Sequence, residues 1–117
     1  MLEVLRELNK EVGVKGSLVL TQDGIVVAAE MGGGIDKDTV AAHASAAVNR
    51  INKALRPLGQ APFSKFVFTA NHGRMVFIAT GEAYIAVLLD KDIKIDVSIL
   101  TIEGAARRIR SMSQIRM

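Results

Sequence analysis

Apolar residues recur every three or four positions in three stretches of the chain, the spacing of one face of an α-helix. These stretches are Met1–Val12, Asp36–Leu58 and Lys94–Met117. Polar residues fill most of the positions between, so each stretch predicts an amphipathic helix with one buried stripe. In the central stretch Asp36 and Asp38 suit a helix start, since a short carboxylate accepts hydrogen bonds from free backbone N–H groups.

Apolar runs separated by turn residues predict five strands. The first two flank Gln22-Asp23-Gly24, a hairpin signal because Asp-Gly supplies the positive-φ positions of tight turns. The expected strands are Ser17–Thr21, Ile25–Glu30, Phe63–Ala70, Arg74–Thr80 and Tyr84–Leu89. The links that join two strands directly are short, which predicts hairpins and a largely antiparallel sheet. The element order of helix, two strands, helix, three strands, helix predicts one α+β domain over residues 1–117, with helices on both faces of the sheet.

The central helix carries small side chains beside its apolar stripe. Ala41, Ala42, Ser45 and Ala46 would let the helix approach another backbone closely, so it is expected both to pack on the sheet and to touch a second partner. Half of all residues are hydrophobic, which is high for a chain of 117 residues. A domain of this kind buries part of its apolar surface against another chain, and we expect self-association.

Composition excludes several kinds of chemistry. The chain has no cysteine, so disulfides, thiolate catalysis and zinc–cysteine sites are excluded. The net charge of +3 is weak and no dense basic run appears, so no nucleic-acid partner is expected. No window reaches the ~20 apolar residues of a membrane helix, and Met1–Gly16 lacks an apolar signal core. We expect a cytoplasmic protein without stable membrane insertion.

No residue pattern indicates a catalytic, cofactor or metal site. Gly32-Gly33-Gly34 precedes a helix but lacks the Gly-Lys-Ser/Thr spacing of a phosphate loop. His43 lies among alanines and His72 in a turn, with nothing to couple them. The carboxylate pairs Asp36/Asp38 and Asp90/Asp92 are explained by a helix start and by a turn, respectively. The final-helix arginines fit either a solvated helix end or a patch for an acidic partner. They are Arg107, Arg108, Arg110 and Arg116.

Four segments together resemble the roadblock / dynein light chain family, whose relatives include the bacterial GTPase regulator MglB. KGSLVLTQDGIVVAAE at Lys15–Glu30 is similar to the family's opening hairpin, and DTVAAHASAAVNRINKAL at Asp38–Leu55 to its small-residue central helix. GRMVFIATGEAYIAVLLDKDI at Gly73–Ile93 resembles its last hairpin, and VSILTIEGAARRI at Val97–Ile109 its closing helix. The resemblance covers nearly the whole chain, and order and spacing carry it rather than any single motif.

The resemblance implies a profilin-like fold whose five strands lie in the order 2-1-5-4-3. The central helix covers one face and the terminal helices the other. It also implies a homodimer that joins two sheets through the central helix and the strand that follows it. The expected seam residues are Ala41, Ala42, Ser45, Ala46, Asn49, Phe63, Lys65, Phe66, Val67 and Phe68. An apolar edge strand with Lys65 as its single charge is poorly protected, which agrees with such pairing.

The implied function is that of a non-enzymatic module that binds Ras-like small GTPases and regulates or scaffolds them, with stimulated GTP hydrolysis in some members. Exposed polar residues of the central helix are expected to contact the partner. These residues are Lys37, His43, Arg50 and Lys53. Arg74 follows a turn, but the resemblance points to relatives that reposition the GTPase's own residues without inserting an arginine. The alternative is a profilin-like sensor of a small ligand, or a signalling scaffold domain.

Overall fold

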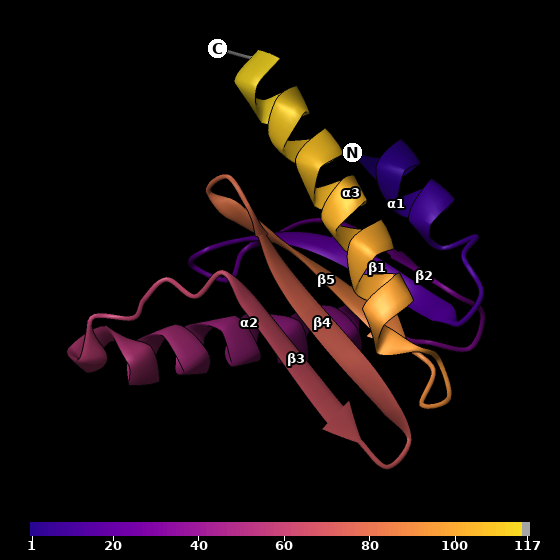
Figure 1. The fold of residues 1–117 in the computed structure, drawn as a ribbon, viewed down its shortest axis with the longest axis horizontal. Coiled ribbons are helices and arrows are strands. Elements are labelled where there is room, and N and C mark those ends of the chain that lie inside the picture. Colours follow the sequence, from indigo (N-terminus) through magenta and orange to yellow (C-terminus); the bar gives the residue numbers. More distant parts are fainter. Residues whose placement is uncertain (116–117) are drawn as a thin grey trace.

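The computed structural model describes residues 1–115, which form three α-helices, one short 3-10 helix and five strands (Figure 1). The helices are α1 (Leu2–Leu8), α2 (Lys37–Leu55), η1 (Arg56–Leu58) and α3 (Ile95–Ile115). The strands are β1 (Val14–Thr21), β2 (Val26–Met31), β3 (Lys65–Ala70), β4 (Gly73–Thr80) and β5 (Ala83–Leu89).

The five strands form one antiparallel sheet in the order β2-β1-β5-β4-β3. Both the fold class and the strand order expected from the sequence are confirmed. The Asp23-Gly24 hairpin forms as predicted: Gly24 has φ of 90°, a conformation that a side chain would strain. Its N–H donates to the carbonyl of Thr21 at 2.9 Å, which closes the turn between β1 and β2.

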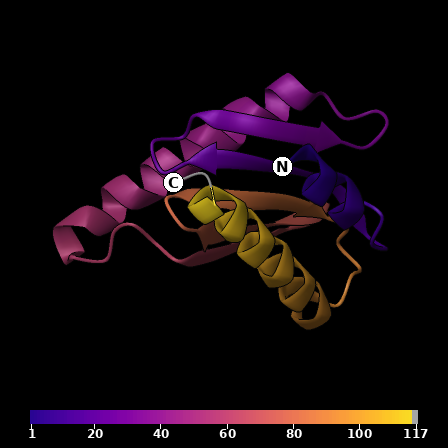
Figure 2. The ribbon, with the colours of Figure 1, turned by 90° about the horizontal axis from the view of Figure 1, so that it is seen from above.

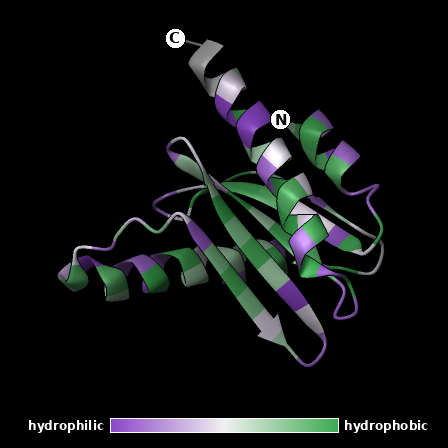
Figure 3. Cartoon of the chain, viewed as in Figure 1, coloured by the Kyte–Doolittle hydropathy of each residue, from purple (hydrophilic) through white to green (hydrophobic). Residues whose placement is uncertain are grey.

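Helices cover both faces of the sheet, with α2 on one face and α1 and α3 on the other (Figures 1 and 2). Side chains alternate along β5, so that Tyr84 and Ala86 join the core under α2 while Ile85 and Val87 join the core under α1 and α3. This two-sided burial explains why the central strands are apolar along most of their length (Figure 3).

The first helix is shorter than its apolar stripe predicts, because it ends at Leu8 rather than Val12. Asn9 caps the helix, and its backbone N–H still donates to the carbonyl of Leu5 at 2.9 Å. The N–H groups of Lys10 and Glu11 then bond to carbonyls three residues back, so the chain tightens and leaves the α-helix. The Asn9 side chain donates to the carbonyl of Glu30 at 3.0 Å and accepts from the Ser17 hydroxyl at 2.7 Å, which holds the end of α1 against β1 and β2. β1 begins at Val14 instead of Ser17.

The central helix begins and ends close to the predicted positions. Asp36 is its N-cap, and its carboxylate accepts from the N–H of Asp38 at 3.0 Å. Regular α-helix stops at Leu55, three residues before the predicted end, because the chain tightens into η1 around Pro57. Gly59 then adopts the left-handed conformation that terminates the segment.

The remaining boundaries shift by one or two residues. The strand after α2 starts at Lys65, so Phe63 is not part of it. α3 starts at Ile95 instead of Lys94, and the last two positions of the predicted helix, Arg116 and Met117, lie outside the described residues.

Candidate interaction surface

β3 forms an uncovered edge of the sheet. Within residues 1–115 it pairs with β4 alone, so the backbone groups on its other side have no neighbouring strand in the described part of the chain. Val67 and Phe68 are 39% and 53% exposed on its two faces, and Lys65 is its one charged residue. β2 forms the opposite edge, but α1 and α2 both pack against it. An apolar edge without such cover invites pairing with another strand.

Phe63 corrects one of the predicted seam residues. Its side chain is only 6% exposed, and its ring stacks on Tyr84 with the centroids 4.4 Å apart. Phe63 therefore belongs to the core of its own chain under α2, because the large ring gains more from that burial than from an edge position. Phe66 is intermediate between a core residue and an exposed edge residue, because it is partly buried against the same core.

The small residues of α2 do not all lie on one flank. A side chain at Gly24 would collide with the Ser45 hydroxyl and the Asn49 amide, so these two residues lie beside the turn between β1 and β2. Asn49 is exposed and Ser45 half-buried. This flank is next to the β2 half of the sheet, whereas β3 is at the far edge. Ser45 and Asn49 are thus separated from the edge strand with which the sequence analysis grouped them.

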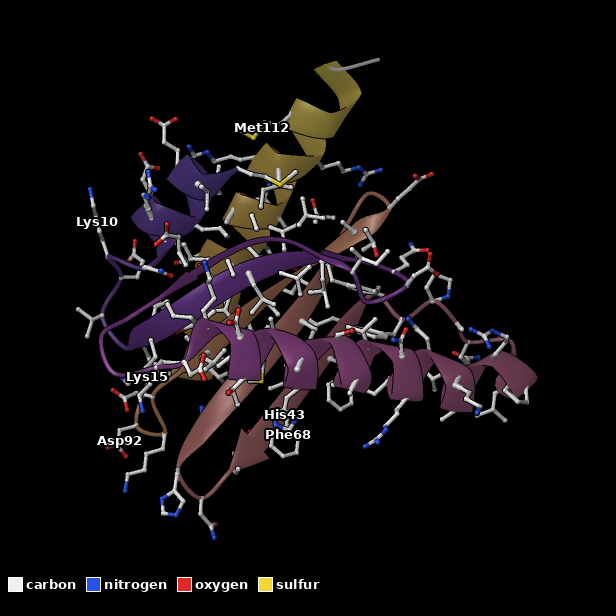
Figure 4. All side chains as sticks on the ribbon, turned by 180° about the vertical axis from the view of Figure 1, so that it is seen from behind. Lys10, Lys15, His43, Phe68, Asp92 and Met112 are labelled. Carbon is white, nitrogen blue, oxygen red and sulfur yellow. The ribbon has the colours of Figure 1, made fainter. Side chains whose placement is uncertain are left out.

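The flank of α2 half a turn away carries a different set of side chains. At 100° per residue, His43, Ala47, Arg50 and Ala54 lie opposite Ser45 and Asn49. His43 points from α2 toward the end of β3 that carries Phe68 (Figure 4). The exposed apolar edge of β3 and this flank of α2 are the candidate interaction surface.

The four expected partner-contacting residues are all exposed. Helical geometry brings three of them together, because His43 and Arg50 are seven residues apart and Lys53 follows one turn later. Lys37 lies in the first turn, rotated away from this group. The structure therefore assembles a basic stripe from the middle and end of α2 and leaves Lys37 outside it.

A buried polar cluster holds the segment that leads into β3, and the sequence analysis missed it. Asn52 Oδ1 accepts from the N–H of Phe63 at 3.0 Å, while the Tyr84 hydroxyl donates to the carbonyl of Phe63 at 2.8 Å. Asn52 Nδ2 donates to the same hydroxyl at 3.4 Å. Burial raises the pKa of the Tyr84 phenol, and the hydrogen bond from Asn52 partly opposes that rise. The available signal was an asparagine at a position of the apolar stripe of α2.

Arg74 is bound within its own chain. Its Nη1 donates to the carbonyl of Ile93 at 3.0 Å, and its Nε is buried without a hydrogen-bond partner among the described residues. It thereby ties the first residues of β4 to the loop between β5 and α3. This arrangement suits a structural role, because the charged group is not free to reach into another molecule.

The described arginines of α3 are exposed, and one of them is paired. Arg108 Nη1 lies 2.7 Å from the carboxylate of Glu7 on α1, and this hydrogen bond and charge hold the Glu7 pKa below its usual range. Arg107 and Arg110 line a shallow hollow with Glu103 beside the turn between β4 and β5. The neighbouring carboxylate weakens the hollow as an anion site.

Two structural observations bear on metals and membranes. Among the described residues, no three His, Asp or Glu side chains converge to hold a metal ion. Over residues 1–115, no helix has the length and apolarity needed to cross a bilayer.

Comparison with known proteins assigns the family. The model of the Roadblock/LC7 domain matches residues 1–90. The chain belongs to the Roadblock/LC7 domain family. Three uncharacterized proteins of Methanocaldococcus jannaschii are each 33% identical to this Roadblock/LC7 chain over 109 residues, which cover 93% of it and 92–96% of each relative.

Solved structures share the fold of this Roadblock/LC7 domain at low sequence identity. MglB of Myxococcus xanthus is 16% identical with a TM-score of 0.82, covering 96% of this chain and 93% of its own. Gliding protein MglB of Thermus thermophilus is 21% identical with a TM-score of 0.79, covering 97% and 87%. Profilin IB of Acanthamoeba castellanii, 10% identical with a TM-score of 0.64, covers 93% and 95%. The resemblance to the roadblock fold and its profilin-like architecture is therefore confirmed.

Proposed function

We propose that the protein is a non-enzymatic, cytoplasmic interaction module that forms a homodimer through β3 and α2 and binds a Ras-like small GTPase, which it regulates or scaffolds. The observation that carries the proposal is the uncovered, apolar edge of β3. An edge strand of this kind is stable in solution when a second strand satisfies its N–H and C=O groups.

The proposed dimer interface consists of the exposed edge of β3 and the neighbouring flank of α2. Two copies of β3 would pair across a two-fold axis and extend both sheets, and Val67 and Phe68 would then leave water. The neighbouring flank of α2 would face its own copy, with Ala46 and Ala47 permitting a close approach. Ala41, Ala42, Ser45 and Asn49 lie farther round the helix, and their part in the seam stays a prediction.

The GTPase half rests on family membership and on the structural neighbours called MglB. The resemblance implies that family members bind Ras-like GTPases, and the exposed stripe of His43, Arg50 and Lys53 offers a basic surface for an acidic patch on such a partner. Acceleration of GTP hydrolysis is part of the proposal as a regulatory outcome.

Light scattering tests the dimer. Phe68→Lys would place a charge on each side of the paired strands, and Ala46→Glu would bury a carboxylate beside α2. Both variants should therefore show a lower mass than the unsubstituted chain at the same concentration. Val27→Lys is the matched control, since Val27 is also an exposed apolar residue of an edge strand, β2. An unchanged mass for Phe68→Lys and Ala46→Glu would contradict the seam.

Capture from the source organism's lysate tests the partner. The chain serves as bait once with GDP and once with a slowly hydrolysed GTP analogue, and prey are identified by mass spectrometry. Capture of a small GTPase mainly in the GTP state supports a regulator, and capture in both states supports a scaffold. Lys53→Glu, at a position outside the flank of α2 that faces the second copy, should weaken capture without changing the mass of the bait. Absence of any GTPase in both arms would contradict this half of the proposal.

A further inference from the structure

An apolar groove runs between the end of α1 and the start of α3, on the face of the sheet opposite α2. Its volume is about 280 Å³, and its floor includes the buried side chains of Leu8 and Ile102. Its rim is formed by the turn after α1, the start of β1, the end of the loop between β5 and α3, and the first turns of α3. The rim residues are Glu11, Val12, Val14, Ile93, Lys94, Val97, Ser98 and Thr101.

Two apolar residues of this rim, and a third beside the groove on α3, are strongly exposed. Val12 and Val97 are 88% and 63% exposed, and Leu100, one turn along α3 from Val97, is 69% exposed. The other aliphatic residues of the same helix, such as Ile102 and Ile109, are buried against the sheet. Neighbouring apolar side chains gathered around a groove mark a contact surface, whereas single exposed ones do not.

The rim carries one acidic and one basic side chain. Glu11 and Lys94 both line the groove and are exposed, and neither has a salt-bridge partner among residues 1–115. Charges nearby do find partners within the chain: Lys15 lies 3.4 Å from Asp90, and Arg108 lies 2.7 Å from Glu7. In a two-fold interface every contact between two different residues occurs twice, so one acidic and one basic rim group make two matched pairs.

We propose that the groove is a second self-association surface, in which two copies of this chain meet face to face around a two-fold axis. Glu11 of each copy pairs with Lys94 of the other, and Val12, Val97 and Leu100 leave water. The groove and the edge of β3 lie on different parts of the molecule, so the two contacts do not compete. A chain that uses both would form assemblies larger than a dimer.

Charge reversal distinguishes this arrangement from any other occupant. Glu11→Lys turns both cross-axis pairs into pairs of ammonium groups, and Lys94→Glu turns both into pairs of carboxylates. Each variant alone should therefore self-associate at the groove at least tenfold more weakly.

Combining the two substitutions restores the opposite charges. In an equimolar mixture, each groove charge of the Glu11→Lys chain meets a carboxylate of the Lys94→Glu chain. In the chain that carries both substitutions, the acidic and basic positions are exchanged but still face each other. The mixture and the doubly substituted chain should both recover the wild-type association.

Sedimentation and light scattering over a wide concentration range provide the measurement, in the Phe68→Lys background and without it. The background variant removes the β3 contact, so failure of the proposed seam and failure of the groove interface are seen separately. Val97→Lys should abolish the groove contact in both backgrounds, whereas Glu3→Lys, an equal charge change on α1 away from the groove, should leave it intact.

Two results of the self-association measurements would overturn the proposal. One is a Phe68→Lys chain that stays monomeric up to millimolar concentration. The other is self-association that Val97→Lys leaves unchanged or that mixing the charge variants does not restore. A small apolar molecule retained in the groove on native mass spectrometry, with no self-association, would instead assign the groove to a ligand and likewise overturn the interface.

Discussion

The side chains of Asn52 and Tyr84 lie 3.4 Å apart under α2, and between them they bind both backbone polar groups of Phe63. Asn52 comes from α2 and Tyr84 from β5, so the cluster fixes the chain between η1 and β3 to the helix and to the middle of the sheet. The position of the exposed strand β3 therefore depends on a buried hydrogen-bond network two residues before it starts.

Removal of the Tyr84 hydroxyl should destabilise the fold. Tyr84→Phe keeps the ring that stacks on Phe63 but leaves the carbonyl of Phe63 without its donor. An unsatisfied buried acceptor costs about 1–3 kcal/mol of unfolding free energy. Urea unfolding followed by circular dichroism measures this loss. Thr69→Val, which removes an exposed hydroxyl on β3, serves as the control and should change stability by less than about 0.5 kcal/mol.

Stability should fall in alkaline solution because of the same phenol. Burial raises the pKa of Tyr84 in the folded state above its ordinary value of 10.0. The phenol therefore ionises at a lower pH in the unfolded chain than in the folded one. Its contribution to the free energy of unfolding is complete below about pH 10 and is lost as the pH rises through the folded pKa. Tyr84 is the one tyrosine of the chain, so its phenolate absorbance can be titrated directly. Tyr84→Phe should lack this part of the pH dependence; an unchanged alkaline profile would contradict the assignment.

Much of the fold could be predicted from the sequence because its signals are local. Asp23-Gly24 indicated a hairpin, and the strand order followed from a resemblance that the structure confirms. The errors occurred where tertiary contacts override local pattern. The apolar stripe continues to Val12, but the helix ends at Leu8, where the Asn9 side chain bonds to Glu30 and Ser17 on the neighbouring strands.

The interaction surface was less predictable than the fold. Spacing on α2 identified small residues but could not tell which flank of the helix lies toward β3. In the structure, the contact of Gly24 with Ser45 and Asn49 shows which flank of α2 lies toward the turn between β1 and β2. Similarly, alternation places Phe63 and Phe68 on opposite faces of the predicted strand, but it does not reveal that Phe63 precedes the strand and is buried whereas Phe68 is exposed at the edge. Both points depend on where elements sit relative to each other, which local pattern does not determine.

The start of α2 should be sensitive to Asp36. Its carboxylate accepts from the N–H of Asp38 at 3.0 Å and from the hydroxyl of Thr39 at 2.9 Å. Asp36→Ala should lower stability and increase hydrogen exchange in the first turn of α2, because free N–H groups lose their acceptor. Asp38→Ala is the control: it keeps the cap and should have a smaller effect.

The contribution of Asp36 should also disappear in acid. The hydroxyl of Thr39, followed by the N–H of Asp38, lowers its pKa below the ordinary 3.8. A carboxylate whose pKa is lower in the folded state stabilises the fold at any pH above its pKa in the unfolded chain. That stabilisation is lost as the pH falls from about 3.8 through the lower pKa of the folded state. The difference in stability between wild type and Asp36→Ala should shrink over this range. A difference that stays constant would exclude the carboxylate as its source.

Arg74 should have a structural role, and a single substitution can distinguish that role from direct contact with a GTPase. Arg74→Met keeps the aliphatic stem but removes the bond from Nη1 to the carbonyl of Ile93. Loss of this charge-assisted hydrogen bond should speed hydrogen exchange in the loop between β5 and α3. The substitution also removes the buried Nε that has no partner among the described residues, and this offsets part of the loss of unfolding free energy. If the protein stimulates GTP hydrolysis, Arg74→Met should retain most of that stimulation, because loss of an arginine acting on the transition state would cost about 10³-fold or more. Loss of stimulation on that scale with unchanged exchange in the loop would instead place Arg74 in contact with the GTPase.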